Sequence, residues 1–224
     1  MGRDASAVPR DRTVEIAPYN ERIIATVFLL SPAYCGGRRA TYLMRPGSRL
    51  PLAQRLASGT LTLGEAFAFM SGLYFRGKLA YATAFGRALV ITPTRGLLPP
   101  DAPVSNELLI EFAGVDVDAG DHRYRQPMDR SIQKLKRDLA AEARVVLLGS
   151  IATGKYVDVL TAGLGDRLHF PPAFVGRGDM SRGGLMLRAA ADRVELEYAV
   201  LSGDVQRHGA RPPKLPPLKK SPSL

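Results

Sequence analysis

The chain has 224 residues, of which 46% are hydrophobic and 23% are charged, so it can form a substantial hydrophobic core. It contains one cysteine, which excludes an internal disulfide framework, and no apolar run approaches the roughly 18 residues that span a membrane. The first residues are polar and lack a hydrophobic signal region. These features predict a cytoplasmic globular protein without a membrane partner.

The net charge of +10 is concentrated in one part of the chain. Residues 31–100 hold nine arginine and lysine residues against a single acidic residue, Glu65. Like charges repel across a compact surface, so this excess favours a polyanionic partner, and nucleic acid is the usual one. The alternative is a basic solvated surface without a partner.

The first element expected is a buried strand. Residues 23–30 form an unbroken apolar run, which ends at Ser31-Pro32 because proline cannot donate a hydrogen bond to a neighbouring strand. Residues 1–20 before it are expected to form an arm. Hydrophobic periodicity, capping signals and turn residues predict the elements that follow. In chain order they are helices at about 49–57, 61–70 and 72–85, a strand at 88–91, a short helix within 106–117, a helix at 129–143, a strand at 145–148, a helix at 155–162, a strand at 167–170 and an alternating hairpin at 185–200.

This order predicts an α/β fold with a mostly parallel central sheet flanked by helices and a C-terminal antiparallel hairpin. The domain is expected to span 21–201, and a disordered, basic, proline-rich tail to follow at 202–224. Ligands of open α/β sheets bind beyond the carboxyl ends of the strands. We therefore look for function in the loops that follow the strands.

The loop SPAYCGGRR, after the first strand, has glycines that allow close backbone approach to a ligand. Arg38 and Arg39 suit a phosphate, the Ser31 hydroxyl could bond a base, and the Tyr34 ring could stack on one. The alternative is a plain turn with solvated arginines. Cys35 is expected to be buried and inert, because the three histidines are remote in sequence and could not serve as its base.

The stretch GSIATGKY, residues 149–156, follows a strand, opens a helix and fits the phosphate-loop pattern G-x-x-x-x-G-K. Tyr156 stands where that pattern requires a serine or threonine, so the hydroxyl that binds Mg²⁺ is missing. The sequence therefore predicts a glycine-rich anion cradle beside Lys155 rather than a site of nucleotide hydrolysis.

The stretch FVGRGDMSRGG, residues 174–184, contains four glycines. It also contains four charged or hydroxyl side chains: Arg177, Asp179, Ser181 and Arg182. Such a loop could hold a carboxylate and two guanidinium groups at a ligand, and Asp179 is the best candidate for a general base. The alternative is an Arg–Asp pair that fixes a long loop. The acidic stretch VDVDAGDH, residues 115–122, matches no known metal-loop spacing, so no metal or cofactor is expected.

The segments LYFRGKLAYATAFG and TRGLLPPDAPVS, with a strand between them, resemble a bacterial domain family of unknown function. That family is similar to the YaaA peroxide-stress proteins and to the accessory domain of archaeosine transglycosylases, which resemble the uracil-DNA-glycosylase fold. The resemblance covers about residues 24–105 and extends more weakly to 144–188. It implies a glycosylase-like three-layer architecture and a nucleic-acid context. The matching positions are Ser31, Tyr74, Arg76, Gly96, Leu97, Pro99 and Asp101.

The chain departs from classical uracil glycosylases, because it lacks their Asp-Pro-Tyr and His-Pro-Ser loops. The leading hypothesis is therefore a DNA glycosylase-like enzyme that acts on an altered or modified base flipped into a pocket, with DNA favoured over RNA. Asp179, Asp101 and Ser31 are the candidate catalytic residues, and Tyr34 and Tyr74 would stack on the base. The candidate phosphate-binding residues are Arg38, Arg39, Arg76, Lys78, Arg95, Lys155, Arg177, Ser181 and Arg182. A non-catalytic DNA-binding module and a nucleotide- or phosphate-binding enzyme that uses residues 149–156 are the alternatives.

Overall fold

The structure of the protein is a computed structural model that describes residues 26–203 and 205–215. The predicted arm, the first residues of the predicted first strand and the end of the predicted tail lie outside the described residues.

Six strands of the described chain form one mixed sheet in the order β3-β2-β1-β4-β5-β6. The four inner strands run parallel, and the short strand at each edge is antiparallel to its neighbour. The predicted α/β fold with a mostly parallel sheet is thereby confirmed. Across the sheet the strands are β3 (Gly96–Leu98), β2 (Arg87–Thr92), β1 (Thr26–Leu30), β4 (Arg144–Leu148), β5 (Leu168–Phe170) and β6 (Ala199–Val200).

The predicted helices up to residue 117 are confirmed within a few residues, and an unpredicted helix follows the first loop. The helix expected at 129–143 begins and ends earlier, at His122 and Asp138. It begins earlier because Asp121 caps it by accepting a hydrogen bond from the Arg123 amide at 2.9 Å. The α-helices of the described chain are α1 (Arg38–Met44), α2 (Pro51–Ala57), α3 (Leu63–Ser71), α4 (Leu73–Phe85), α5 (Asn106–Ala113), α6 (His122–Asp138), α7 (Gly154–Leu164) and α8 (Asp179–Asp192), with short 3-10 turns η1 (Gly165–Arg167) and η2 (Pro172–Phe174).

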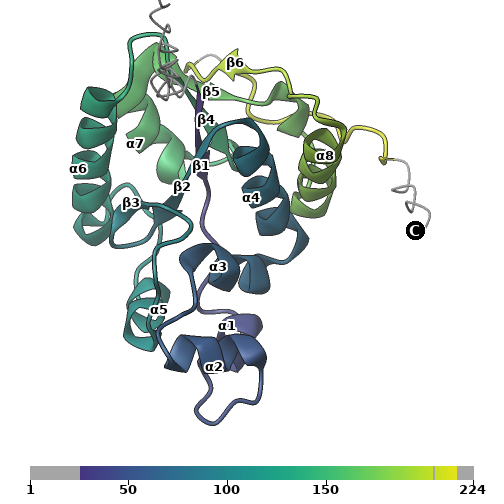
Figure 1. Cartoon of the computed structure of the whole chain (residues 1–224). Coiled ribbons are helices and arrows are strands. Elements are labelled where there is room, and N and C mark those ends of the chain that lie inside the picture. Colours follow the sequence, from purple (N-terminus) through teal and green to yellow (C-terminus); the bar gives the residue numbers. More distant parts are fainter. Residues whose placement is uncertain (1–25, 204, 216–224) are drawn as a thin grey trace, which may run out of the picture.

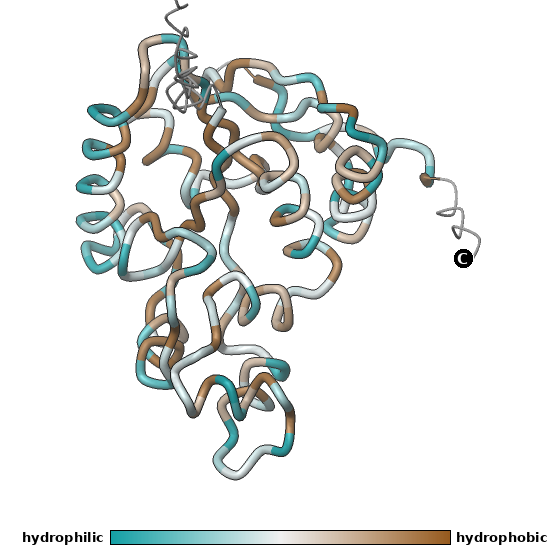
Figure 2. The backbone as a smooth tube through the Cα atoms, viewed as in Figure 1, coloured by the Kyte–Doolittle hydropathy of each residue, from teal (hydrophilic) through white to brown (hydrophobic). Residues whose placement is uncertain are grey.

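The inner strands are covered on both faces, which gives three layers (Figure 1). Side chains alternate between the faces of a strand, so in β1 Phe28 and Leu30 meet the layer of α4 and α8, whereas Val27 and Leu29 meet α6 and α7. Hydrophobic residues accordingly follow the central strands, and hydrophilic residues line the outer side of α6 (Figure 2).

A helical lobe made of α1, α2, α3 and α5 lies beyond the carboxyl ends of β1 and β2 (Figure 1). The loop after β3 joins this lobe, because the amides of Leu63 and Gly64 donate to the carbonyl groups of Ala102 and Pro100 at 2.8 and 2.7 Å. A capping box of Thr62 and Glu65 starts α3. The lobe thus rises next to the sheet edge at which ligands of this fold class bind.

The turn after β2 owes its shape to Gly96. Its φ is 64°, and a Cβ there would lie 2.2 Å from Ser131 Oγ and 2.5 Å from the Pro127 carbonyl oxygen of α6. Only glycine satisfies both demands, so the chain reverses at this point and β3 pairs with β2.

The predicted hairpin at 185–200 is wrong. Its first half is helical, and in its second half only Ala199–Val200 form a strand, β6. Residues 179–192 form α8, whose buried residues include Arg182, Met186 and Ala189, and these recur at helical spacing. The helix ends at Asp192, and Arg193 after it adopts a left-handed conformation with φ 55°. The C-terminal antiparallel pair is instead β5 with β6.

No helix in the described part of the chain is both long enough and apolar enough to cross a membrane.

Candidate functional site

The loops that follow β1, β2 and β4 meet at the carboxyl edge of the sheet and enclose a cavity of about 370 Å³. The helical lobe closes its other side through α5 and the segment that follows it. The lining residues are Pro32, Ala33, Tyr34, Cys35, Pro93, Phe112, Val115, Asp116, Val117, Ser150, Thr153, Lys155 and Tyr156. A cavity therefore lies beyond the carboxyl ends of the strands, where the sequence predicted a ligand site.

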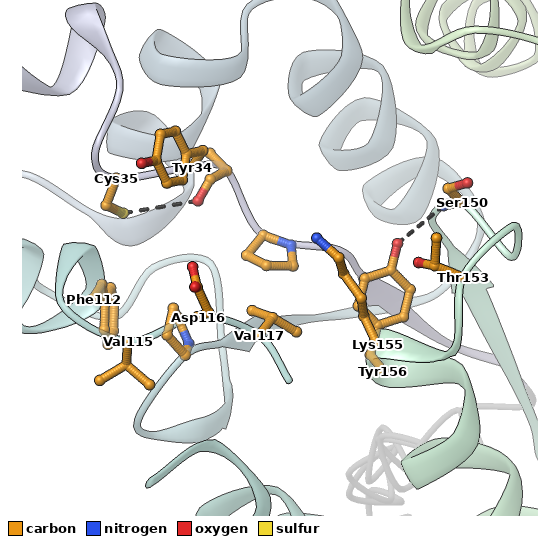
Figure 3. A pocket seen from close by; sticks show the side chains of 13 residues that line it. Tyr34, Cys35, Phe112, Val115, Asp116, Val117, Ser150, Thr153, Lys155 and Tyr156 are labelled. Carbon is orange, nitrogen blue, oxygen red and sulfur yellow. Dashed lines mark hydrogen bonds between the residues drawn. The ribbon is translucent and has the colours of Figure 1, made fainter. Parts of the chain in front are cut away.

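Most of the cavity wall is apolar, and a few polar groups interrupt it. The carboxylate of Asp116 and the ammonium group of Lys155 extend from opposite segments of the wall (Figure 3). Tyr34 is 71% exposed and supplies an aromatic ring that a ligand can reach. A flat, largely apolar ligand with polar edges suits such a wall.

The glycine-rich loop between β4 and α7 lies at this cavity as predicted, but its backbone is not open to a phosphate throughout. The Ser150 amide donates to the Tyr156 hydroxyl at 3.1 Å, so the tyrosine that replaces the expected serine or threonine folds back onto its own loop (Figure 3). Lys155 is exposed on the cavity wall. The loop can place a cation at a ligand, while one of the amides available to an anion is already satisfied.

The most unusual side chain near the cavity is Lys78, which is fully buried. Its Nζ donates to the Ser31 carbonyl oxygen at 2.6 Å and to Ser31 Oγ at 2.9 Å, and it lies 4.2 Å from the centre of the Tyr74 ring. The prediction that Lys78 binds phosphate at the surface is wrong, because its amine points to Ser31 after β1 and lies beside the rings of Tyr74 and Phe75. Lys78 cannot reach a phosphate on the surface in this conformation.

Burial disfavours the charged form of Lys78 and lowers its pKa to about 7, while Asp179 opposes that shift and Arg182 adds to it. Ser31, which accepts hydrogen bonds from Lys78, directly precedes Pro32 on the cavity wall. A Cβ at Gly149 would lie 2.9 Å from the Tyr156 oxygen and 3.2 Å from Ser31 Oγ, so the two hydroxyl groups face the same point. Burial raises the pKa of Tyr156, and a hydrogen bond with Ser31 works against that increase.

Asp179 and Arg182 come from the first turn of α8 and not from a loop over the cavity. Arg182 is buried and donates to the Phe174 carbonyl oxygen at 3.1 Å, and it pairs with Asp179 at 3.5 Å. The Asp179 side chain is 66% exposed. The expectation that residues 174–184 form a loop that holds these groups at a ligand in the cavity is therefore wrong, although Asp179 and Arg182 lie close enough to act on the charge of Lys78.

The two tyrosines proposed to stack on a base have different surroundings. Tyr34 lines the cavity, whereas Tyr74 is 6% exposed and packs against Lys78. Tyr74 cannot stack on a ligand without leaving the core. The structure instead brings Tyr156 to the cavity wall, a residue that the sequence marked only as a departure from the phosphate loop.

Other predicted site residues lie outside the cavity wall. Arg95 pairs with Glu111 of α5 at 2.5 Å. Asp101 is exposed in the loop that joins the helical lobe. Arg38 is exposed at the start of α1, and Arg39 and Arg76 line a separate shallow groove beside α3.

Cys35 lines the cavity but is buried, and burial raises the pKa of its thiol to about 12. A thiol of this kind is protonated at neutral pH, so Cys35 does not supply a nucleophile. Asp116 is the acidic residue on the wall, and its sequence signal was present in the acidic stretch 115–122 that we considered only for metal ions. Among the described residues no group of histidine, cysteine and acidic side chains could hold a metal ion.

Comparison with protein-family models, with curated proteins and with solved structures finds no match to this chain, so the function of the cavity has to be inferred from its own geometry.

Proposed function

We propose that the protein processes nucleic-acid bases, and that the cavity at the carboxyl edge of the sheet accepts a single base taken out of its stack. The observation that carries this proposal is the cavity itself, a mostly apolar space of about 370 Å³ with the exposed ring of Tyr34 on its wall. A base offers two flat apolar faces and a polar edge, and aromatic side chains bind such faces by stacking. The charge of +10 and the excess of basic residues in 31–100 favour the polyanion to which a base is attached.

The resemblance to glycosylase-like proteins supports the same class of reaction, cleavage of the bond between a base and its sugar, with an altered base in DNA as the expected substrate. In that step water adds its oxygen to the sugar carbon, and the electron pair of the breaking bond passes to the base. Asp116 would accept the proton of the water or stabilise the positive charge on the sugar. Lys155 would donate a hydrogen bond to the departing base. Asp116 replaces Asp179 and Asp101 in this role, because it is the carboxylate on the cavity wall.

The binding part of the proposal is tested with a fluorescent single-stranded oligonucleotide titrated against the full chain. We expect Tyr34→Ala to weaken binding about tenfold through the loss of one stacking contact. Tyr42→Ala is the matched control, because Tyr42 is also an exposed tyrosine and does not line the cavity. Equal affinities of the two variants would contradict a stacking role for Tyr34.

The chemical part is tested by base release from oligonucleotides that carry uracil, hypoxanthine, alkylated purines or deazapurines. Where a base is released, Asp116→Asn should slow release about a hundredfold with binding retained. Asp118→Asn is the control, since Asp118 is an exposed neighbour that does not line the cavity.

A binding module without catalysis is the second candidate, and the positions of Asp179 and Asp101 outside the cavity wall favour it. It predicts the stacking effect of Tyr34 without base release from any of these oligonucleotides.

A further inference from the structure

A second hollow, of about 430 Å³, lies between the start of α4, the start of α8 and the C-terminal segment 211–215. We call it the tail groove. Among the described residues that line it there is no acidic side chain. Four of the lining side chains are cationic: Arg177, Arg188, Arg211 and Lys214.

The C-terminal segment is held against the domain by specific contacts. Arg177 Nη1 donates to Ser181 Oγ at 3.2 Å and to the Pro213 carbonyl oxygen at 3.5 Å. A Cβ at Gly176 would lie 2.2 Å from the Ala210 carbonyl oxygen, so the segment passes directly over this glycine. The described part of the tail, up to Leu215, therefore forms one wall of the groove instead of leaving the domain.

Three of the four cations, Arg177, Arg211 and Lys214, form no ion pair within the described residues. The oxygen atoms that accept hydrogen bonds from Arg177 belong to neutral groups. The nearby carboxylate of Asp179 is paired with Arg182. Cations gathered in this way repel one another, and a polyanion in the groove would offset that repulsion.

The groove also lies next to the residues that reach the cavity. Leu73 lines the groove, and the adjacent Tyr74 packs on Lys78, which bonds Ser31. Ser31 precedes Pro32 on the cavity wall. The groove and the cavity therefore both adjoin the cluster formed by Tyr74, Lys78 and Ser31.

We propose that the tail groove binds the phosphate backbone of the nucleic-acid strand whose base enters the cavity, with Arg211 and Lys214 of the tail as phosphate contacts. This inference rests on the proposed function and assigns the basic tail a part in it. The tail would act as a wall of the binding site and not as a linker.

The test measures the affinity of the full chain for a fluorescent single-stranded oligonucleotide as a function of NaCl concentration. Log affinity falls linearly with log salt, and for a single strand each phosphate contact contributes about 0.7 to the steepness of this fall. The double variant Arg211→Ala/Lys214→Ala should therefore make the fall less steep by about 1.4. Between about 50 and 200 mM NaCl the salt-induced loss of affinity should then be about sevenfold smaller than in the unmodified protein. Lys136→Ala/Arg137→Ala is the matched control, because it removes the same charge from the last turn of α6 in the opposite helix layer and should retain most of the slope.

Three results would overturn the inference. If the unmodified protein binds but the tail variant keeps its slope, or if both variants lose the same amount, the groove is not the backbone site and the proposed function stands. If the unmodified protein binds no nucleic acid at all, both proposals fail.

Discussion

Two glycine-rich stretches, 149–154 and 176–184, look alike in sequence but serve different purposes in the structure. The first stretch is a loop at the carboxyl end of β4, and it lines the cavity. The second contains the start of α8, and its Gly183 lies against Gly77 of α4. A Cβ at Gly77 would lie 2.6 Å from the Gly183 carbonyl oxygen. In the first stretch, a Cβ at Gly149 would lie 2.9 Å from the Tyr156 oxygen, so glycine there makes room for a neighbouring side chain. In the second stretch, glycine allows one helix backbone to approach another.

Two lysines near these stretches have different surroundings. Lys78 of α4 is fully buried, because its Nζ donates to Ser31 just after β1 and lies beside the rings of Tyr74 and Phe75. Lys155, which follows the loop at 149–154, is exposed on the cavity wall. Two lysines that a sequence would treat alike thus have opposite surroundings.

The largest expected effect is that of Gly183→Ala on stability. Its Cβ would lie 2.8 Å from the Leu73 carbonyl oxygen and 2.9 Å from the Tyr74 Cα, and backbone atoms cannot move aside cheaply. We expect a loss of about 3 kcal/mol in the free energy of unfolding, measured by urea denaturation. Gly184→Ala is the control, since its nearest neighbour would be Leu215 Cδ1 at 3.9 Å, and it should be neutral or stabilising. Equal effects would show that α4 and α8 are not in backbone contact.

Lys78 should make stability depend on pH. The folded pKa is about 7 and the unfolded value is 10.5, so between these values the unfolded chain binds one more proton and stability rises with pH. From pH 7 to 9 the unfolding free energy should increase by up to about 1.4 kcal/mol per pH unit, and Lys78→Met should abolish this increase. Above pH 9 the raised pKa of Cys35 acts in the opposite direction, because the folded thiol keeps its proton longer. If the unfolding free energies of the unmodified protein and of Lys78→Met change with pH in the same way, Lys78 is exposed to water.

Tyr156→Phe tests the first stretch in the same way. It removes the oxygen that accepts from the Ser150 amide at 3.1 Å and should cost about 1 kcal/mol of stability. Tyr42→Phe changes an exposed tyrosine and should have no measurable effect. A neutral Tyr156→Phe would mean that water replaces the hydroxyl and that the loop is open to an anion after all.

The smallest effect on stability is expected for Tyr34→Ala. Its ring is 71% exposed, so unfolding should change by less than about 0.5 kcal/mol while oligonucleotide binding weakens. Thermal denaturation measures the effect on stability, and the binding titration measures the effect on oligonucleotide affinity. A clear loss of stability would identify Tyr34 as part of the fold and not of the site.

Much of the sheet and the position of the cavity could be predicted from local patterns. The apolar runs at 88–91 and 145–148 become inner strands, and the rule that ligands bind past the carboxyl ends of strands locates the cavity. The residues on its wall were harder to predict. Asp116 and Phe112 reach the cavity because α5 and the segment after it fold back over the sheet edge, which is a long-range arrangement without a local pattern.

The sequence by itself determined the α/β class, the order of the inner elements, the capping box of α3 and the first loop as part of the site. These features depend on residues close in the chain, whose periodicity and hydrogen-bonding groups act locally. Only the tertiary structure decided that 179–192 is a helix, since small residues there satisfy both helical and alternating patterns. It also decided that Lys78 is buried, because its partner Ser31 lies 47 residues earlier in the chain and only the fold brings the two together.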